Sequence, residues 1–120
     1  MDQTIYVDNR EDWKVQRIAQ QHWGDRVKFS SLITGDYICG DVCIERKTVG
    51  DFLQSFMNGR LQNQVQKMRA NFNKCYIIVV GSPADAAFVN WSSDAFEKKL
   101  WSFSLENNIK IGRATSEKMF

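Results

Sequence analysis

The chain has 120 residues, 43% hydrophobic and 25% charged, a balance typical of one globular domain with a single packed core. Sixteen Lys and Arg against 14 Asp and Glu give a net charge of +2, too small to indicate a nucleic-acid partner by itself. No apolar run reaches the roughly 18 residues of a membrane span, and the acidic N-terminus lacks a signal-peptide pattern, so we expect an intracellular protein without a membrane partner, cytoplasmic in a prokaryote or virus and nuclear in a eukaryote.

The three cysteines argue against both disulfides and zinc. Their number is odd, and Cys39 and Cys43 fall in strand-like sequence, which suits reduced thiols in a cytosol. A zinc site would have to join these two with Cys75 and the single histidine, His22. Because no pair shows the C-x-x-C spacing typical of zinc ligands, we disfavour zinc.

The first predicted elements are a strand, a helix and a second strand. Residues 5–8 form a short apolar run that leads into a polar turn, as the end of a strand does. Residues 12–23 place apolar side chains at helical spacing, and Gly24 is a natural stop. Residues 27–29 alternate apolar and polar side chains, which predicts a half-buried strand.

The next stretch predicts a tight hairpin. Two β-type runs, residues 37–39 and 42–44, flank Gly40-Asp41, and glycine first in a two-residue loop is the signature of a type II′ turn. This turn fixes the register, in which the opposed pairs are Cys39 and Val42, Ile38 and Cys43, Tyr37 and Ile44, and Asp36 and Glu45. Lys47 lies two residues beyond Glu45 and so projects from the same face.

Two helical segments should follow the hairpin. Thr48 and Asp51 fit a helix-capping pattern, and the apolar stripe behind them continues to about residue 57. Gly59 interrupts the helix, and residues 61–72 then repeat the helical spacing on the same side.

The last predicted elements complete an α/β pattern. Residues 76–80 are a continuous apolar run, typical of a strand covered on both faces. A late helix follows Ser93, and residues 109–111 form a short final strand. Strands that alternate with helices predict an α/β fold with a mixed sheet flanked by helices.

Asp36, Glu45 and Lys47 form the constellation that carries chemistry. Like charges directly opposite each other destabilise a sheet, so two facing carboxylates indicate either a cation between them or a protonated carboxyl. Hard cations such as Mg²⁺ prefer oxygen ligands, often one or two carboxylates with water and phosphate oxygens. A lysine on the same face would orient the attacking water or stabilise charge on a phosphate. Together the three residues predict a phosphodiester-hydrolysis site.

A structural explanation of these residues stays open. Glu45-Arg46-Lys47 could be a solvated strand end, and Asp36 could open a turn after Gly35. The expected register favours the functional interpretation, because random surface charges seldom place two opposed acids beside a lysine. Arg46 should point to the opposite face of its strand, where a backbone or phosphate contact is its expected role.

Three motifs resemble one family. Gly35-Asp36-Tyr37, followed by IERKTVGD at residues 44–51, is similar to the G-D-x(n)-E-R-K-x-x-x-D signature of XPF/Hef-type structure-specific endonucleases. The sequence VDNRE at residues 7–11 resembles that family's opening V-D-x-R-E, and NGRLQNQ at residues 58–64 resembles its G-R-L-x-x-Q segment. The motifs occur in the family's order, and the resemblance runs from about residue 4 to residue 112.

The resemblance implies a restriction-endonuclease-like fold, a central mixed β-sheet flanked by α-helices, with one nuclease domain over residues 1–120 and no helix-hairpin-helix module. It also implies cleavage of branched DNA, such as 3′ flaps or forks, with Mg²⁺ or Mn²⁺ as the cofactor. The implied partners are branched DNA and a second subunit, in a homodimer or in a heterodimer with a related chain. The spacing between Asp36 and Glu45 is short for the family, so loop contacts of longer relatives should be missing.

Carried over position by position, the resemblance assigns the site residues. The implied catalytic residues are Asp8, Glu11, Asp36, Glu45, Arg46, Lys47 and Asp51. Among them, the four implied metal ligands are Asp8, Glu11, Asp36 and Glu45. The implied DNA contacts are Arg10 and Arg60.

Some of these positions also have a structural explanation. Asp51 fits a helix cap as well as a catalytic role, and we weigh the two evenly. Glu11 could begin a helix favourably through its dipole, but we favour a functional role for it and for Asp8, because the first strand should end beside the hairpin. Arg60 could contact a DNA phosphate or cap the broken helix.

Two other classes of function compete with an active structure-specific endonuclease. The chain could be a silent DNA-binding or scaffold subunit, which the intact acidic and basic positions of the signature disfavour. It could also be a resolvase or a general DNase of the same fold, which shared metal chemistry does not separate from a flap nuclease. Eight further cations are scattered along the sequence, and although some could line a phosphate track, we expect most of them on solvated faces. We assign the four tryptophans to packing rather than base stacking.

Overall fold

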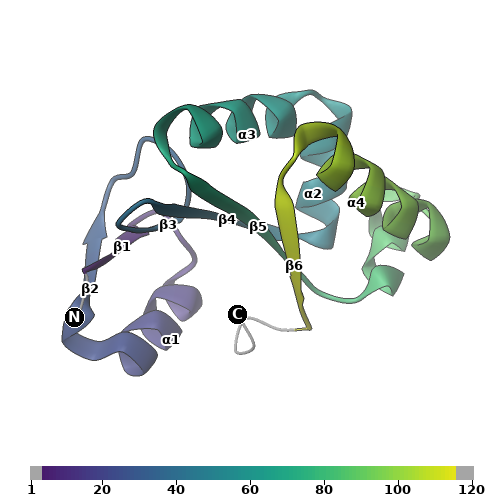
Figure 1. The fold of residues 1–120 in the computed structure, drawn as a ribbon. Helices are drawn as coiled ribbons and strands as arrows, with labels where there is room; N and C mark the ends of the chain where they lie inside the picture. The colour runs from purple at the N-terminus through teal and green to yellow at the C-terminus, as the bar shows by residue number, and fades with distance from the viewer. Residues whose placement is uncertain (1–3, 116–120) are drawn as a thin grey trace.

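The structure, a computed structural model, describes residues 4–115 and contains one six-stranded sheet in the order β2-β1-β3-β4-β5-β6 (Figure 1). The strands are β1 (Ile5–Asp8), β2 (Val27–Ser30), β3 (Tyr37–Cys39), β4 (Val42–Thr48), β5 (Lys74–Val80) and β6 (Lys110–Ala114). The pairs β1–β2, β4–β5 and β5–β6 are parallel, whereas β1–β3 and β3–β4 are antiparallel. The sheet is therefore mixed, as the sequence predicts.

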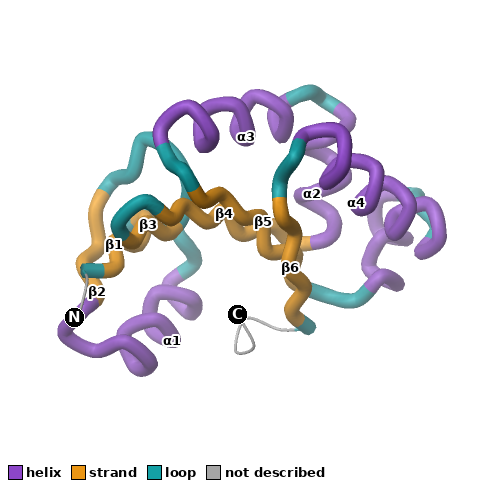
Figure 2. The backbone as a smooth tube through the Cα atoms, in the orientation of Figure 1, coloured by secondary structure: helices purple, strands orange, loops and turns teal. Residues whose placement is uncertain are grey.

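Helices cover both faces of this sheet. They are α1 (Trp13–Trp23), α2 (Val49–Met57), α3 (Arg60–Asn71) and α4 (Ser93–Asn107), with 3₁₀ turns η1 (Gly24–Arg26) and η2 (Pro83–Val89). Figure 2 shows α2, α3 and α4 on one side of the strands and α1 on the other. No helix in residues 4–115 combines the length and the apolar character that crossing a membrane requires.

The two faces carry separate hydrophobic cores. The larger core lies under α2, α3 and α4, and its fully buried side chains include Phe52, Leu61, Ile77 and Phe96. The smaller core lies between α1 and the first strands, and its buried members are Ile5, Val7, Val15, Ala19 and Tyr37. The site described below lies where these two halves of the sheet meet.

The predicted hairpin is confirmed, with its register. Tyr37 pairs with Ile44, Ile38 with Cys43 and Cys39 with Val42. Gly40 has a φ of 59°. Asp41, the second residue of the turn, is not among the residues of the described chain that have a positive φ. A type I′ turn needs a positive φ at both central residues and a type II′ turn only at the first, so this turn is of type II′.

The predicted boundaries around the two central helices are also confirmed. The Thr48 hydroxyl accepts the backbone N–H of Asp51 at 3.1 Å and caps α2. Gly59, with a φ of 82°, separates α2 from α3. This left-handed conformation favours glycine because it has no Cβ.

Three details differ from the sequence prediction. β5 begins at Lys74, two residues early, because its parallel pairing with β4 extends back to Val42. β6 runs from Lys110 to Ala114 rather than over residues 109–111, because it follows β5 to its end at Val80. The 3₁₀ turn Pro83–Val89 was not predicted, although Ser82 and Asp85 form a capping box at its start.

The cysteines are free thiols, as expected. Cys43 and Cys75 are direct neighbours on β4 and β5, and burial raises the pKa of the Cys43 thiol to about 12. Within residues 4–115 no group of three or more His, Cys, Asp or Glu side chains is arranged to hold a metal ion.

Candidate active site

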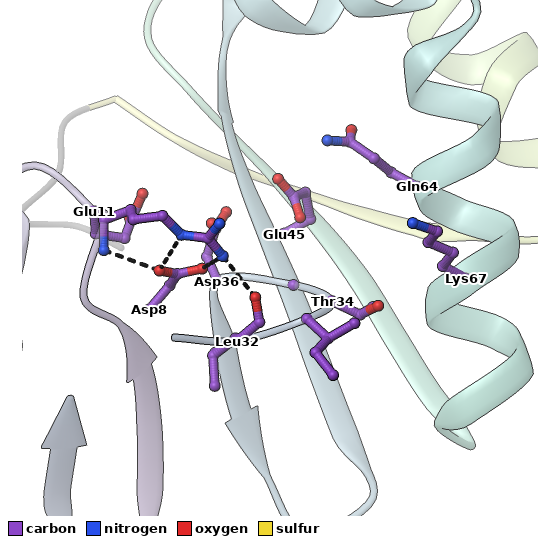
Figure 3. A pocket seen from close by; sticks show the side chains of 11 residues that line it. Asp8, Glu11, Leu32, Thr34, Asp36, Glu45, Gln64 and Lys67 are labelled. Atoms are coloured by element: carbon purple, nitrogen blue, oxygen red, sulfur yellow. Dashed lines mark hydrogen bonds and ion pairs between the residues drawn. The ribbon is translucent and has the colours of Figure 1, made fainter. Parts of the chain in front are cut away.

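A pocket of about 330 Å³ lies between the hairpin and α3. Its walls come from the end of β1, the loop before β3, the middle of β4 and the middle of α3 (Figure 3). The lining residues are Asp8, Arg10, Glu11, Leu32, Ile33, Thr34, Gly35, Asp36, Glu45, Gln64 and Lys67. Four of them are acids, and they include both carboxylates that the hairpin register brings together.

The backbone holds Asp36 beside β4. Its N–H donates to the carbonyl of Ile44 at 2.9 Å, and its Oδ2 accepts the N–H of Arg46 at 2.8 Å. Gly35, with a φ of 78°, makes this approach possible, because a Cβ there would clash with the Cys43 sulfur. In the G-D pair, glycine is therefore required for steric reasons, and aspartate supplies the carboxylate.

Asp36 and Glu45 share a hydrogen bond between their side chains. Burial, then the charges of Glu45 and Glu11, raise the pKa of Asp36 to about 8. Burial also raises the pKa of Glu45, which is 8% exposed, although Lys47 partly opposes this change. The pair as a unit therefore keeps a proton near neutral pH.

Lys47 lies beside Glu45 as predicted. Its Nζ is 3.6 Å from Glu45 Oε2, and both side chains are nearly buried, at 13% and 11% exposed. One lysine against two adjoining carboxylates leaves the site one positive charge short of neutrality. This deficit adds to the effect of burial in raising the pKa of Asp36.

Asp8 is bound by its neighbour Arg10. Asp8 Oδ1 accepts the Arg10 N–H and Nε, each at 2.9 Å, and Oδ2 lies 2.7 Å from Nη2. The same Nη2 donates to the Leu32 carbonyl at 2.6 Å. Chiefly through these bonds, Arg10 holds the pKa of Asp8 below its ordinary value.

Glu11 connects the N-terminal segment to β4. Its Oε2 accepts Arg46 Nε at 2.8 Å and the Tyr37 hydroxyl at 3.0 Å. The side chains of Arg46 and Glu11 are 12% and 10% exposed, so this is a largely buried ion pair. Arg46 and Tyr37 lie on the face opposite Glu45, which confirms the expected orientation of Arg46 and shows a carboxylate partner that the sequence did not reveal.

Two residues of α3, Gln64 and Lys67, were missed as part of the pocket. They lie three positions apart, on one face of the helix, and project toward Glu45 (Figure 3). The Gln64 Oε1 atom is buried without a hydrogen-bond partner in the described structure. Lys67 is exposed to solvent, as expected for most of the remaining cations, and it also lines the pocket.

Asp51 and Arg60 lie outside the pocket. Asp51 is exposed in the first turn of α2, where its N–H completes the Thr48 cap. Arg60 begins α3, and its N–H and Nε both donate to Asn58 Oδ1, at 3.1 and 3.2 Å. Both residues therefore take part in hydrogen bonds at the start of a helix, as their structural explanation predicts. Their roles in catalysis or DNA binding stay predictions.

The resemblance seen in the motifs extends to the whole chain. A family model described as the ERCC4 domain matches residues 7–120. The chain belongs to this family. In this chain the G-D segment comes directly before β3, and the E-R-K segment lies on the neighbouring strand β4.

Related proteins of known name share this domain. The chain is 29% identical over 110 residues to the 3′-flap repair endonuclease Xpf of Saccharolobus solfataricus, covering 89% of the chain and 46% of that protein. It is 26% identical over 108 residues to the DNA repair endonuclease UVH1 of Arabidopsis thaliana, covering 89% of the chain and 11% of that protein. The chain thus spans less than half the length of these relatives.

Solved structures agree with the fold. XPF from Aeropyrum pernix matches with a TM-score of 0.81 and 27% identity, over 97% of this chain and 58% of that one. The same protein in complex with DNA matches with a TM-score of 0.79 and 25% identity, over 98% and 58% of the two chains. The mixed sheet flanked by helices is therefore that of an XPF-type nuclease domain, as predicted.

The donor set of this ERCC4 domain fits a hard divalent cation at two carboxylates. Asp36 and Glu45 supply oxygen ligands, and a cation between them would replace the proton that they share. Asp8 and Glu11 line the same pocket, but their oxygens are engaged by Arg10 and by Arg46 with Tyr37. The fit therefore rests on Asp36 and Glu45, with Asp8 available only if Arg10 moves.

Proposed function

We propose that this ERCC4 domain is a divalent-metal-dependent endonuclease that hydrolyses phosphodiester bonds in branched DNA. The observation that carries the proposal is the hydrogen-bonded pair of Asp36 and Glu45, nearly buried beside Lys47 in an open pocket. A site built only for stability would not keep two adjoining acids with too few cations. The relatives whose names include endonuclease, and the related structure in complex with DNA, support nucleic acid as the substrate.

The two carboxylates would hold Mg²⁺ or Mn²⁺, with Asp36 giving up its proton on binding. Such a cation, when bound, supplies positive charge against the scissile phosphate and makes a nearby water more acidic. The protein's own task is to place these charges without water between them, since electrostatic stabilisation is strongest in a preorganised, partly dry site.

The lysines on either side of the carboxylates would bind the substrate. Lys47, already beside Glu45, stabilises the charge that develops on the phosphate oxygens. Lys67 and Gln64, on the α3 wall, face the carboxylates across the pocket and supply an ammonium and an amide to a phosphodiester lying between the walls. Arg10, whose guanidinium side chain is 68% exposed at the mouth, is placed to exchange Asp8 for a DNA phosphate.

The test is cleavage of labelled 3′ flap, fork, four-way-junction and plain duplex DNA with Mg²⁺ or Mn²⁺. We expect Asp36→Asn and Lys47→Ala to cut at least about a hundredfold more slowly than the wild type, since each removes a charge that the transition state needs. Lys98→Gln, which removes an exposed charge on α4, should cut like the wild type.

Each outcome has a definite meaning. Undiminished cutting by Asp36→Asn would overturn the proposed site. Tight binding of DNA without cutting by the wild type would indicate a silent DNA-binding subunit instead. Equal cutting of all four substrates would retain the nuclease and remove the specificity for branched DNA.

A further inference from the structure

A second cavity lies at the end of the sheet where β5 and β6 begin. We call it the α3–β6 pocket, and its volume of about 340 Å³ is close to the 330 Å³ of the pocket at Asp36 and Glu45. It is lined by Arg69, Phe72, Asn73, Cys75, Tyr76, Asn108 and Lys110. None of these described lining residues is acidic, so the two cations meet no opposite charge in the cavity wall.

Contacts within the protein hold both cations in place. Arg69 Nη1 donates to the Asn107 carbonyl at 2.7 Å, which uses one of the five donors of the guanidinium and leaves the others for a ligand. The Lys110 Nζ lies 5.9 Å from the centre of the Tyr76 ring. Asn73 and Asn108, both exposed, add amide groups at the rim. This combination of fixed cations, amides and an aromatic ring suits a phosphate chain with bases attached.

The surrounding sequence is depleted in acids. Residues 52–84 contain no Asp or Glu, although an even spread of the chain's 14 acids would place about four there. The same segment contains four cations, which are Arg60, Lys67, Arg69 and Lys74. Helix α3 and strand β5 therefore carry these cations and no acid.

Helix α3 joins the two cavities. Lys67 lines the catalytic pocket and Arg69 lines the α3–β6 pocket. Side chains two positions apart on a helix point in directions that differ by about 200° around the helix axis. The two side chains therefore leave opposite flanks of α3 near its C-terminal end. A strand that passes around this end would meet Lys67 first and Arg69 next.

We propose that the α3–β6 pocket binds the phosphodiester backbone of the DNA strand that leaves the catalytic pocket around the end of α3. The proposal rests on the function proposed above. Because α3 is about 10 Å across, such a strand needs about three nucleotides beyond the cleavage site to reach Arg69. The pocket then acts as a second anchor that recognises an arm of a branched substrate by its charge.

The first test measures binding as a function of arm length. Fluorescence anisotropy is used with flap DNA whose arm has 0, 2, 4 or 8 nucleotides, in the Asp36→Asn background to prevent cutting. We expect affinity to rise at least about tenfold between the 0- and 8-nucleotide arms, with most of the gain by about four nucleotides. The double variant Arg69→Gln/Lys110→Gln should lose this gain, and its salt dependence on the long arm should be shallower by about 1.4 in log K against log salt, as for two lost single-strand phosphate contacts.

Matched controls separate this effect from general charge and from misfolding. Lys28→Gln/Lys98→Gln removes two exposed cations on β2 and α4, and it should keep the arm-length gain. Arg69→Lys keeps the charge and should keep most of the gain. If the control pair loses the gain as fully as the pocket pair, the anchor is unspecific surface charge and the inference is wrong.

The thiol in the pocket gives a second readout. Cys75 lines the α3–β6 pocket, whereas Cys39, also partly exposed, lies at the end of the β3–β4 hairpin. DNA with a long arm should slow alkylation of Cys75 at least about fivefold and leave Cys39 unchanged. Protection of Cys75 by millimolar inorganic phosphate as strong as by DNA would indicate a small-anion site and overturn the strand anchor.

The outcomes distinguish this inference from the proposed function. Cutting by the wild type without any arm-length dependence of binding removes the anchor and leaves the nuclease. Arm-dependent binding without cutting by the wild type keeps the anchor and removes the catalytic proposal. No binding of any DNA removes both.

Discussion

Replacing Asp36 by Asn should change how the stability of this domain depends on pH. In the folded chain the pKa of Asp36 is about 8, against an ordinary value of 3.8. Between these values the folded state holds a proton that the unfolded state has lost, so the free energy of unfolding falls as pH rises. The slope is about 1.4 kcal/mol per pH unit, which amounts to about 2.7 kcal/mol between pH 5 and pH 7.

The Asn variant lacks this titration but keeps the local structure. Its side-chain carbonyl can still accept the N–H of Arg46, and its amide can donate to Glu45. Urea unfolding of both proteins at pH 5, 6 and 7, with EDTA present, measures the difference. We expect the variant to be the more stable protein at pH 7 and the two stabilities to converge toward pH 5.

Divalent cations should offset this difference in stability. Mg²⁺ at about a hundred times its dissociation constant would stabilise the wild type by about 2.7 kcal/mol at pH 7, and it would have much less effect on the variant. If the two proteins show the same pH slope without metal, Asp36 does not hold the extra proton and the electrostatic basis of the site is wrong.

Three further substitutions test the surroundings of the pair. Glu11→Ala leaves the guanidinium of Arg46 nearly buried without its carboxylate and should destabilise the fold by about 3 kcal/mol in urea unfolding, whereas an unchanged midpoint would contradict the ion pair. Gly35→Ala forces a left-handed φ and a clash with a buried sulfur, so we expect a loss of about 1–3 kcal/mol by the same assay. Arg10→Gln removes the partner that lowers the pKa of Asp8. The stability that this lowered pKa provides is present above the unfolded pKa of Asp8 and is lost as pH falls through the folded pKa, so the free energy of unfolding of the variant should depend less on pH below pH 4. An acid unfolding profile identical to that of the wild type would contradict the ion pair.

The geometry of Asp36 and Glu45 could be predicted because it depends on local rules. A two-residue turn beginning with Gly40 sets the register, and the period of two in a strand then decides which side chains share a face. The cap at Thr48 and the break at Gly59 are equally local signals. Each of them is determined by residues within about ten positions of one another.

The missed contacts depend on distances that no local pattern encodes. Glu11 and Arg46 are 35 positions apart and meet only because β1 lies beside the hairpin in the sheet. Lys67 reaches the pocket only because α3 packs on β5, which is paired with β4, so the sequence alone does not separate it from the other exposed cations. The bond between Arg10 and Asp8 is local, and both residues lie in the V-D-x-R-E motif. The motif alone does not show whether its aspartate binds a metal ion or the neighbouring arginine.

The separation of the two hydrophobic cores has a mechanical consequence. Asp36 directly precedes Tyr37 of β3, which belongs to the smaller core. Gln64 and Lys67 lie on α3, which packs into the larger core. A small shear between the two cores would widen or narrow the gap between the hairpin and α3 without exposing the buried side chains of either core. Shear of this kind is a small sliding of packed elements that keeps their contacts. Because β4 pairs with β3 on one side and with β5 on the other, such a shear would change the width of the pocket along this strand.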